Sequence, residues 1–417
     1  MGLLPCPPTY DSEKDSQSNS SHRLHSESST SSLSSQPSLP SVPSLTPPSQ
    51  QQKQVLYATP NCIATLKGHS SYISSLALTG KFLYSGSSNG EIRVWSRNPS
   101  SLLYSSTDNV VATSSGGVKS LVVLGDKLFS AHQDHKIRVW KIENTILNPK
   151  LKCIATLPTI SDYLLRCFCA KNYVEVRRHK KSTWVHHVDA ISTLAISRDG
   201  SLLYSASWDR TFKIWRTYDF RCLESVEKAH DDAINAIIVS HDGFVYTGSA
   251  DKKIKVWKKQ SGEKKHSLVT TMEKHKSAVN ALAPSNDGSV LYSGACDRSI
   301  LVWEKHWSTT GSENGEHMVL TGALRGHGKA ILCLAVLSNL VFSGSADRTV
   351  RIWKKGLDKN YSCLAVLEGH KQPVKCLIAA VDIKNERSVS DSGASCLVYS
   401  GSLDCEIKIW QVQVPCL

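Results

Sequence analysis

The feature that most constrains the fold is a tryptophan that ends a short alternating segment and recurs seven times. In residues 92–95 and 254–257, for example, apolar and basic residues alternate up to the tryptophan, which is the pattern of a half-buried strand. The spacings between successive copies are 45, 75, 42, 46, 50 and 57 residues. The seven residues are Trp95, Trp140, Trp215, Trp257, Trp303, Trp353 and Trp410. This regularity predicts an array of small β-sheets built from one repeated unit.

Three other residue types keep fixed places in the repeat. Six residues before the tryptophan stand Asp134, Asp209, Asp251, Asp297, Asp347 and Asp404, with Asn89 in the first copy. Ten residues before it stand the hydroxyl side chains of Ser85, Ser130, Ser205, Thr247, Ser293, Ser343 and Ser400. Four residues before another predicted strand stand His69, His187, His230, His275, His327 and His370. Ser114 takes the histidine position in the second copy, so we expect that copy to be the least stable of the seven.

Residues 61–417 resemble the WD40 family, whose unit of about 40–45 residues carries Gly-His near one end and Trp-Asp near the other. Glycine precedes His69, His327 and His370, but aspartate never follows the tryptophan here. The resemblance implies an all-β, seven-bladed β-propeller with four strands to a blade. It also implies that the aspartate, histidine, hydroxyl and tryptophan of each blade form a hydrogen-bonded chain.

A second short repeat indicates how the ring closes. Residues 62–66 recur letter for letter at 153–157, directly after the tryptophan strand of the second copy, which marks them as the outer strand of a blade. No blade precedes residues 62–66, so we expect them to pair beside the last strand, at 407–412. Such pairing removes two open sheet edges.

Recurring histidine, serine and aspartate also suggest hydrolase chemistry. Catalysis needs one such set in one pocket, whereas this set occurs about seven times around a ring, so we assign it a structural role. The chain lacks the phosphate-loop, nucleophile-elbow and zinc-protease motifs, and Cys167 and Cys169 have no second cysteine pair. We therefore expect no enzyme activity and no catalytic, cofactor or metal site.

Residues 1–60 differ in composition from the rest. Positions 11–50 contain sixteen serines and few large apolar residues, so this Ser/Pro-rich segment is predicted to be a disordered tail. Thr46, which precedes Pro47, is a candidate phosphorylation site within it.

The formal charge is +13, and residues 1–60 carry three basic and four acidic side chains, so the rest is about +14. This charge favours acidic or phosphorylated protein partners and leaves direct nucleic-acid binding open. No run approaches the ~20 apolar residues that cross a membrane. Thirteen cysteines without a CxxC pair indicate reduced thiols, as in the cytoplasm or nucleus.

The 75-residue spacing places a basic insertion at 158–185, between blades two and three, with two acids and six bases. We predict a short helix capped by Ser161 that presents Leu164, Leu165 and Phe168, then a strand from Tyr173. A basic run that includes Arg177 and Arg178 follows. A long ordered insertion favours a docking element that the blades do not need for folding.

The loops around the central opening supply the other predicted partner-binding residues. They are Tyr72, Trp208, Lys276, Lys329 and Lys371. Trp208 is the large aromatic residue among the positions before the turn acids, and it either anchors a partner or packs on a neighbouring loop.

The insertion, with residues 172–178, and the Ser/Pro-rich leader are similar to plant WD40 proteins of the JINGUBANG type. That family implies a non-enzymatic scaffold or regulator in cytoplasm and nucleus, working through protein contacts in plant development, stress or hormone responses. Two alternatives stay open. One is a substrate receptor of a cullin-RING ubiquitin ligase, which commonly carries Trp-Asp-x-Arg; the other is direct nucleic-acid binding through the basic face.

Overall fold

The computed structural model describes residues 42–46, 59–97, 109–143, 149–167, 173–177, 180–260, 262–308, 315–356, 358–382 and 394–414. The chain divides into two compact units, residues 1–42 and 43–417, and the second is the subject here. Within the predicted tail, only residues 42–46 and 59–60 belong to the described part of the chain.

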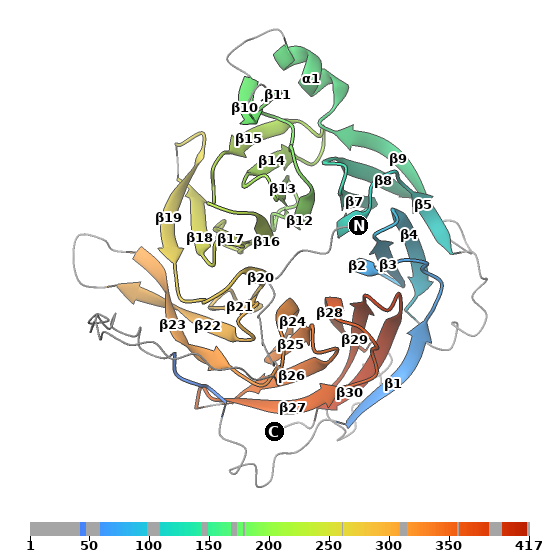
Figure 1. The fold of residues 1–417 in the computed structure, drawn as a ribbon, viewed down its shortest axis with the longest axis vertical. Helices are drawn as coiled ribbons and strands as arrows, with labels where there is room; N and C mark the ends of the chain where they lie inside the picture. The colour runs from blue at the N-terminus through green and yellow to red at the C-terminus, as the bar shows by residue number, and fades with distance from the viewer. Residues whose placement is uncertain are drawn as a thin grey trace, which may run out of the picture. The chain divides into compact units, whose positions relative to one another are not determined.

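Seven four-stranded antiparallel sheets form a ring in the described residues, with their first strands toward the centre (Figure 1). Blade one is β2(Ile73–Thr79), β3(Phe82–Ser87), β4(Glu91–Ser96) and β5(Val110–Thr113). Blade two is β6(Val118–Leu124), β7(Lys127–His132), β8(Ile137–Glu143) and β9(Lys150–Leu157). Blade three is β12(Ile191–Ile196), β13(Leu202–Ser207), β14(Phe212–Arg216) and β15(Cys222–Val226). Blade four is β16(Ile234–Val239), β17(Val245–Ser249), β18(Ile254–Lys259) and β19(His266–Met272).

Blade five is β20(Val279–Pro284), β21(Val290–Ala295), β22(Ile300–Ser308) and β23(Gly315–Leu324). Blade six is β24(Ile331–Leu337), β25(Leu340–Ser345), β26(Val350–Lys355) and β27(Tyr361–Leu367). Blade seven is β28(Val374–Val381), β29(Ala394–Ser402) and β30(Ile407–Val414), completed by β1(Thr59–Leu66). The predicted seven-bladed β-propeller is confirmed.

The first strand closes the ring. β1 runs antiparallel to β30, with Cys62 opposite Trp410 and Leu66 opposite Ile407, so blade seven takes its outer strand from the other end of the propeller. The pairing predicted for residues 62–66 is confirmed. Closure gives blade seven the same four-stranded form as the other blades and leaves no incomplete sheet in the ring.

In blades one, three, four and five, a small polar residue ties the inner strand to the next one. Ser74 Oγ donates a hydrogen bond to Val118 O at 2.5 Å, and Asn280 Nδ2 donates to Ile331 O at 2.8 Å. In both cases the donor is the second residue of one inner strand and the acceptor is the first residue of the next. These bonds satisfy carbonyls on the inner edges, which no fifth strand covers.

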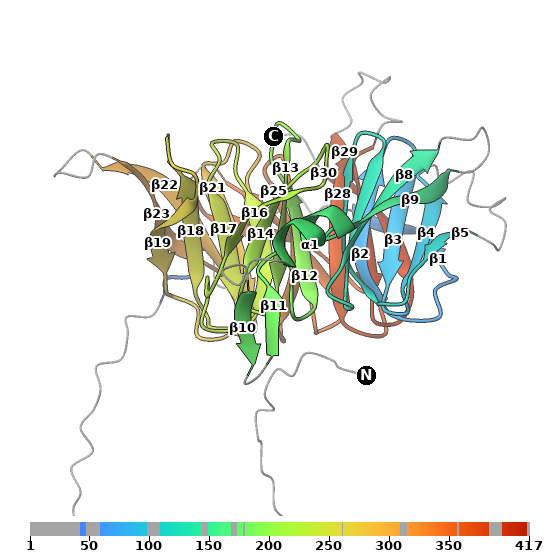
Figure 2. The ribbon, with the colours of Figure 1, turned by 90° about the horizontal axis from the view of Figure 1, so that it is seen from above.

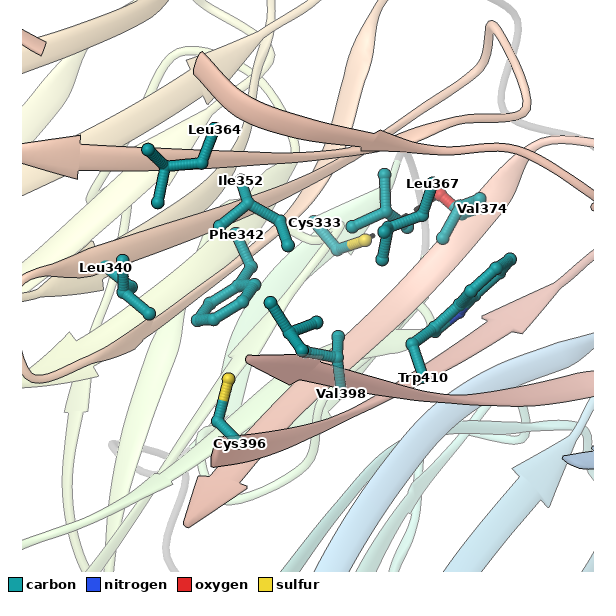
Figure 3. Packing of buried hydrophobic residues seen from close by; sticks show 12 residues of the cluster. Cys333, Leu340, Phe342, Ile352, Leu364, Leu367, Val374, Cys396, Val398 and Trp410 are labelled. Atoms are coloured by element: carbon teal, nitrogen blue, oxygen red, sulfur yellow. Dashed lines mark hydrogen bonds between the residues drawn. The ribbon is translucent and has the colours of Figure 1, made fainter. Parts of the chain in front are cut away.

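Apolar side chains fill the space between neighbouring sheets. Between blades six and seven, Phe342 and Ile352 lie near Val398, and Trp410 covers one end of the cluster (Figure 3). Phe342, Ile352 and Val398 are all fully buried. Because each sheet buries both of its faces against neighbours, a blade depends on the completed ring for its core.

We predict that shortening a buried side chain of the closing strand β1 destabilises the whole ring. Leu66 is 6% exposed and packs with Ile73 and Tyr399, so Leu66→Ala should lower the free energy of unfolding by about 2–5 kcal/mol. Ile154, in the identical segment of blade two, is 42% exposed, and Ile154→Ala should cost less than about 1 kcal/mol. Urea denaturation followed by tryptophan fluorescence measures both. Equal costs would contradict the role assigned to β1.

Candidate functional site

Three buried side chains and a partly buried aspartate form a chain of hydrogen bonds in each of blades three to seven. In blade six, Trp353 Nε1 donates to Ser343 Oγ at 2.9 Å, and Ser343 Oγ donates to His327 Nε2 at 2.8 Å. His327 Nδ1 then donates to Asp347 Oδ2 at 2.8 Å. This order requires the neutral imidazole that carries its proton on Nδ1. We call such a set a tetrad.

The same contacts recur in the other four blades of this group. Their members are His187, Ser205, Asp209 and Trp215; His230, Thr247, Asp251 and Trp257; His275, Ser293, Asp297 and Trp303; His370, Ser400, Asp404 and Trp410.

The tetrads have no group left for catalysis. Each serine or threonine hydroxyl accepts from tryptophan and donates to histidine, and Ser343 is fully buried. A nucleophile must reach a substrate, and these hydroxyls do not. The carboxylates are held ionised: burial opposes the charge of Asp251, but hydrogen bonds from His230 and two backbone amides outweigh it, and its pKa falls to about 2.

Blade one keeps three of the four members. Trp95 Nε1 donates to Ser85 Oγ at 2.7 Å, and Ser85 Oγ bonds His69 Nε2 at 2.7 Å. Asn89 instead accepts from the amide of Glu91 at 3.2 Å, and no hydrogen-bond partner faces His69 Nδ1 among the described residues. The asparagine in the first repeat therefore removes one bond from the chain.

Blade two corrects the prediction that it lacks a histidine. His132, the last residue of β7, bonds Ser130 Oγ at 2.7 Å through Nε2 and donates from Nδ1 to Gly116 O at 2.9 Å. Trp140 Nε1 donates to the same Ser130 hydroxyl at 2.7 Å. Asp134 pairs with Arg138 at 2.5 Å instead of with an imidazole.

A sequence signal for His132 existed. It lies two residues after the repeat hydroxyl, where five other blades carry serine. An imidazole at that position can turn back to the Ser130 hydroxyl of its own strand, so blade two keeps a buried imidazole that arrives from a strand rather than from a loop.

The tetrads define one face of the ring, here called the tetrad face. The loops before the inner strands and the turns before the tryptophan strands alternate with the other turns along each blade, so they share this face. Asp297 Oδ2 accepts from the amide of Lys276 at 2.9 Å, and Asp404 Oδ2 accepts from that of Lys371 at 2.9 Å. Ser345 Oγ donates to Lys329 O at 3.1 Å. The backbone beneath these three exposed lysines is therefore fixed by the tetrads and their turns.

Sequence reasoning missed a second set of basic residues on this face. Directly after the tetrad aspartate, four consecutive blades carry an exposed basic side chain with positive φ. These residues are Arg210, Lys252, Arg298 and Arg348, with φ of 68°, 73°, 67° and 73°. The repeated Asp-Arg and Asp-Lys pairs were visible in the sequence. The tight turn points them away from the sheet, which adds positive charge to blades three to six.

Acids on the same face are concentrated on blades three and four. They include Asp189, Asp231 and Asp232. Lys253 lies 3.5 Å from Asp231 and 3.2 Å from Glu273, so part of this negative charge is paired. The sector over blades five to seven is therefore the more basic part of the face.

The family model described as "WD domain, G-beta repeat" matches residues 60–96, 178–216, 220–258, 266–304, 318–354 and 361–411, more than half of the chain. The chain belongs to the WD40 repeat family. None of the matched segments covers blade two. This is the blade in which His132 replaces the loop histidine.

Two curated relatives give the range of similarity. An uncharacterized WD repeat-containing protein of Schizosaccharomyces pombe, C126.01c, is 24% identical over 264 residues, 62% of this chain and 61% of its own. The Arabidopsis thaliana protein ROOT INITIATION DEFECTIVE 3 is 30% identical over 165 residues, 36% of this chain and 35% of its own. The chain thus spans about three fifths of the first relative's length and about a third of the second's.

Trp208 lies half-buried on the tetrad face of this WD40 ring. The ammonium of Lys119, from the inner strand of blade two, stands 5.1 Å from the centre of its ring, a cation–π contact between two blades. Burial lowers the pKa of Lys119. The Trp208 indole nitrogen is buried without a hydrogen-bond partner among the described residues. Tyr72 is also half-buried, and its carbonyl accepts from the amide of Ser88 at 3.0 Å.

The insertion forms a helix and a hairpin outside the ring, next to blade three (Figures 1 and 2). The helix α1(Ile160–Cys167) is capped by Thr159, whose hydroxyl accepts from the amide of Asp162 at 3.2 Å, so the predicted cap at Ser161 is wrong. Asp162 is buried and accepts from the amide of Cys222 at 3.0 Å, at the edge of β15. The helix therefore contributes one buried contact to blade three, and the expectation that the blades fold without the insertion stays a prediction.

The remaining insertion residues are only partly described. Leu164 in α1 is 51% exposed. Tyr173 and Arg177 are the first and last residues of β10(Tyr173–Arg177), which pairs antiparallel with β11(Lys180–Thr183). Phe168 and Arg178 lie outside the described residues, as does Cys169.

The described ranges contain neither a membrane-spanning helix nor a group of side chains suited to a metal ion. No helix in them is long and apolar enough to cross a membrane. No group of three or more histidine, cysteine, aspartate or glutamate side chains in them is placed to hold a metal ion.

Removing a tetrad aspartate should lower the free energy of unfolding more than removing the corresponding aspartate of blade two. Asp347→Ala removes the carboxylate from the buried His327 Nδ1, leaves it only the longer contact to the Thr349 hydroxyl at 3.3 Å, and should lower the free energy of unfolding by about 1–3 kcal/mol. Asp134→Ala leaves His132 bonded to Gly116; it loses two long hydrogen bonds, from Lys136 N and Ser115 Oγ, and a partly exposed ion pair with Arg138 that is worth at most about 1 kcal/mol. Urea denaturation at pH 7 compares them. A larger loss for Asp134→Ala would refute the assignment of His132.

Buried histidines should make stability fall in mild acid. Burial lowers the pKa of His69 and of His132 to about 4, whereas an unfolded imidazole titrates near 6.5. Between these values the unfolded chain binds more protons, so the free energy of unfolding should decrease as pH falls from 6.5 to 4. His132→Gln removes one titrating group and should flatten this dependence in urea melts. The exposed His241→Gln should follow the unchanged protein, and an equally flat profile for it would contradict the prediction.

Proposed function

We propose that this WD40 protein is a non-enzymatic scaffold that holds an acidic segment of a transcription or signalling regulator on its tetrad face. The observation that carries the proposal is the row of exposed basic side chains on consecutive blades, Arg298 and Arg348 among them, above backbone that the tetrads fix. WD40 repeat proteins generally are protein-interaction scaffolds, and their function resides in such surfaces.

Charge complementarity supports an acidic or phosphorylated segment as the partner. Arginine and lysine side chains on a rigid rim attract carboxylates and phosphates and raise the rate of association. The more basic sector over blades five to seven fits an acidic or phosphorylated peptide, while the half-buried Trp208 and its Lys119 contact lie across the opening.

The setting of this function is also a proposal. The similarity to ROOT INITIATION DEFECTIVE 3 of Arabidopsis thaliana and the JINGUBANG-type insertion support a role in plant development, stress or hormone responses, in nucleus and cytoplasm. The basic rim supports nucleic acid as a second candidate ligand, since phosphate contacts need only positive charge. No tryptophan of the repeats is followed by aspartate, which argues against a ubiquitin-ligase receptor.

Charge reversal on one face tests the proposal. The triple variant Lys276→Glu, Arg298→Glu, Arg348→Glu should reduce affinity capture of proteins from plant extract about fivefold, since three rim charges that contribute a few tenths of a kcal/mol each sum to about 1 kcal/mol. Quantitative mass spectrometry of the captured proteins is the measurement. The insertion variant Arg177→Glu, Arg178→Glu, assayed in parallel, shows whether the insertion extends the same surface.

The matched control reverses three exposed basic residues on the opposite turns. It is Lys81→Glu, Arg198→Glu, Lys264→Glu, and it should keep the wild-type capture profile. Nuclease treatment and a salt series separate nucleic acid from protein, because phosphate-dominated binding weakens steeply with salt and vanishes after digestion. Equal capture by the face variant and the control would reject the tetrad face as the interface.

A further inference from the structure

Residues 43–46, from the segment predicted to be a disordered tail, lie along the edge of blade five and form an isolated β-bridge with it. Leu45 N donates to Ala323 O at 2.9 Å, and Ala323 N donates to Pro43 O at 2.9 Å. Ser44 thereby makes a parallel bridge with Ala323. β23 is the outer strand of its sheet, so the tail supplies partners to an edge that no other strand of the blade covers.

The Leu45 side chain enters the junction of blades five and six. It packs, partly buried, against a core cluster that includes Tyr292, Leu324 and Tyr361. Its carbonyl accepts from the amide of Tyr361, the first residue of β27, at 3.0 Å. Residues 43–46 therefore contact two blades at once, through backbone hydrogen bonds and through one apolar side chain.

A glycine in blade five makes this approach possible. A Cβ at Gly322 would lie 2.6 Å from Leu45 Cγ and 3.0 Å from Pro43 O, closer than packed atoms allow. Gly322 pairs with Val302, the residue before the repeat tryptophan. In five other blades the residue in this register is Ala64, Ala155, Glu224, Thr270 or Ala365. Of the six blades whose register is described here, only blade five has room for the leucine.

We propose that this edge of blade five is a binding site for an extended Pro-Ser-Leu segment, and that the chain's own residues 43–46 occupy it in the free protein. Backbone hydrogen bonds from Ala323 and Tyr361 recognise an extended strand, and the pocket beside Gly322 selects the leucine. Proline at position 43 limits the conformations that binding must freeze. This site lies on the outer edge of the ring and is separate from the tetrad face.

The short linker between residues 43–46 and β1 favours binding of the chain's own segment to the site. Twelve residues, 47–58, join Thr46 to β1, which is held in blade seven, so the segment meets its site at an effective concentration of about millimolar. A partner that presents an extended Pro-Ser-Leu sequence has to displace it. The chain itself contains a second such sequence at residues 37–39.

A labelled peptide of residues 41–48, added to the full-length protein, tests the site. Leu45→Asp places a charge where the leucine packs, so it should empty the site and bind the peptide at least about tenfold more tightly than wild type, which competes with its own segment. Fluorescence anisotropy measures binding. A peptide with aspartate in place of leucine should not bind, and neither should the natural peptide to the double variant Leu45→Asp, Gly322→Val.

Hydrogen exchange tests occupancy in the free protein. The Ala323 and Tyr361 amides should be protected in wild type and in Thr270→Val, the matched change in blade four, and should exchange about tenfold faster in Leu45→Asp. Circular dichroism melts check that each variant is folded. If the double variant is unfolded, the peptide with aspartate in place of leucine provides the test of specificity. The proposal is overturned by unchanged exchange, by equal peptide affinity of wild type and Leu45→Asp, or by a wild-type dimer in sedimentation, which would mean that copies exchange segments.

Discussion

The antiparallel pairing of β1 with β30 is the constraint on which the other features of the ring depend. Every blade buries both faces against neighbours, so an open array would expose two apolar sheet faces and an incomplete seventh blade. The hydrogen bonds from Ser74 and Asn280 to the next inner strand also stabilise the closed ring, because each one fixes a blade against its neighbour. Closure thus turns seven marginal units into one domain with a continuous core.

The tetrads connect this stability to the tetrad face, the surface proposed to bind partners. Each one buries an imidazole and an indole with their hydrogen bonds satisfied, and its carboxylate also accepts from the backbone of the adjoining loop, as Asp297 does from Lys276. The interior network and the exposed rim are therefore parts of one structure. The proposed binding of a partner there would be favoured because the basic side chains stand on backbone that does not have to be ordered on binding.

Two segments that look peripheral in the sequence have structural attachments. Asp162 in the insertion is buried against the amide of Cys222, and Leu45 in the Ser/Pro-rich leader packs at the junction of blades five and six. Both attach to outer strands, where a sheet edge still has unpaired backbone groups. Outer edges of this propeller are thus available for contacts within the chain and, by the same chemistry, for contacts with other chains.

The sequence by itself determined the number of blades, the closing strand and the tetrads of blades three to seven, because each depends on spacing within one repeat or on a segment that recurs letter for letter. Only the tertiary structure decided that His132 replaces the loop histidine of blade two, that Asp134 pairs with Arg138, and that Gly322 admits Leu45. These contacts depend on which side chains meet in space after folding. An imidazole can reach the Ser130 hydroxyl from a strand as well as from a loop, and a missing Cβ matters only where another segment arrives. The sequence shows that His132 and Gly322 are unusual at their positions, but the contacts that each one makes are determined only by the folded structure.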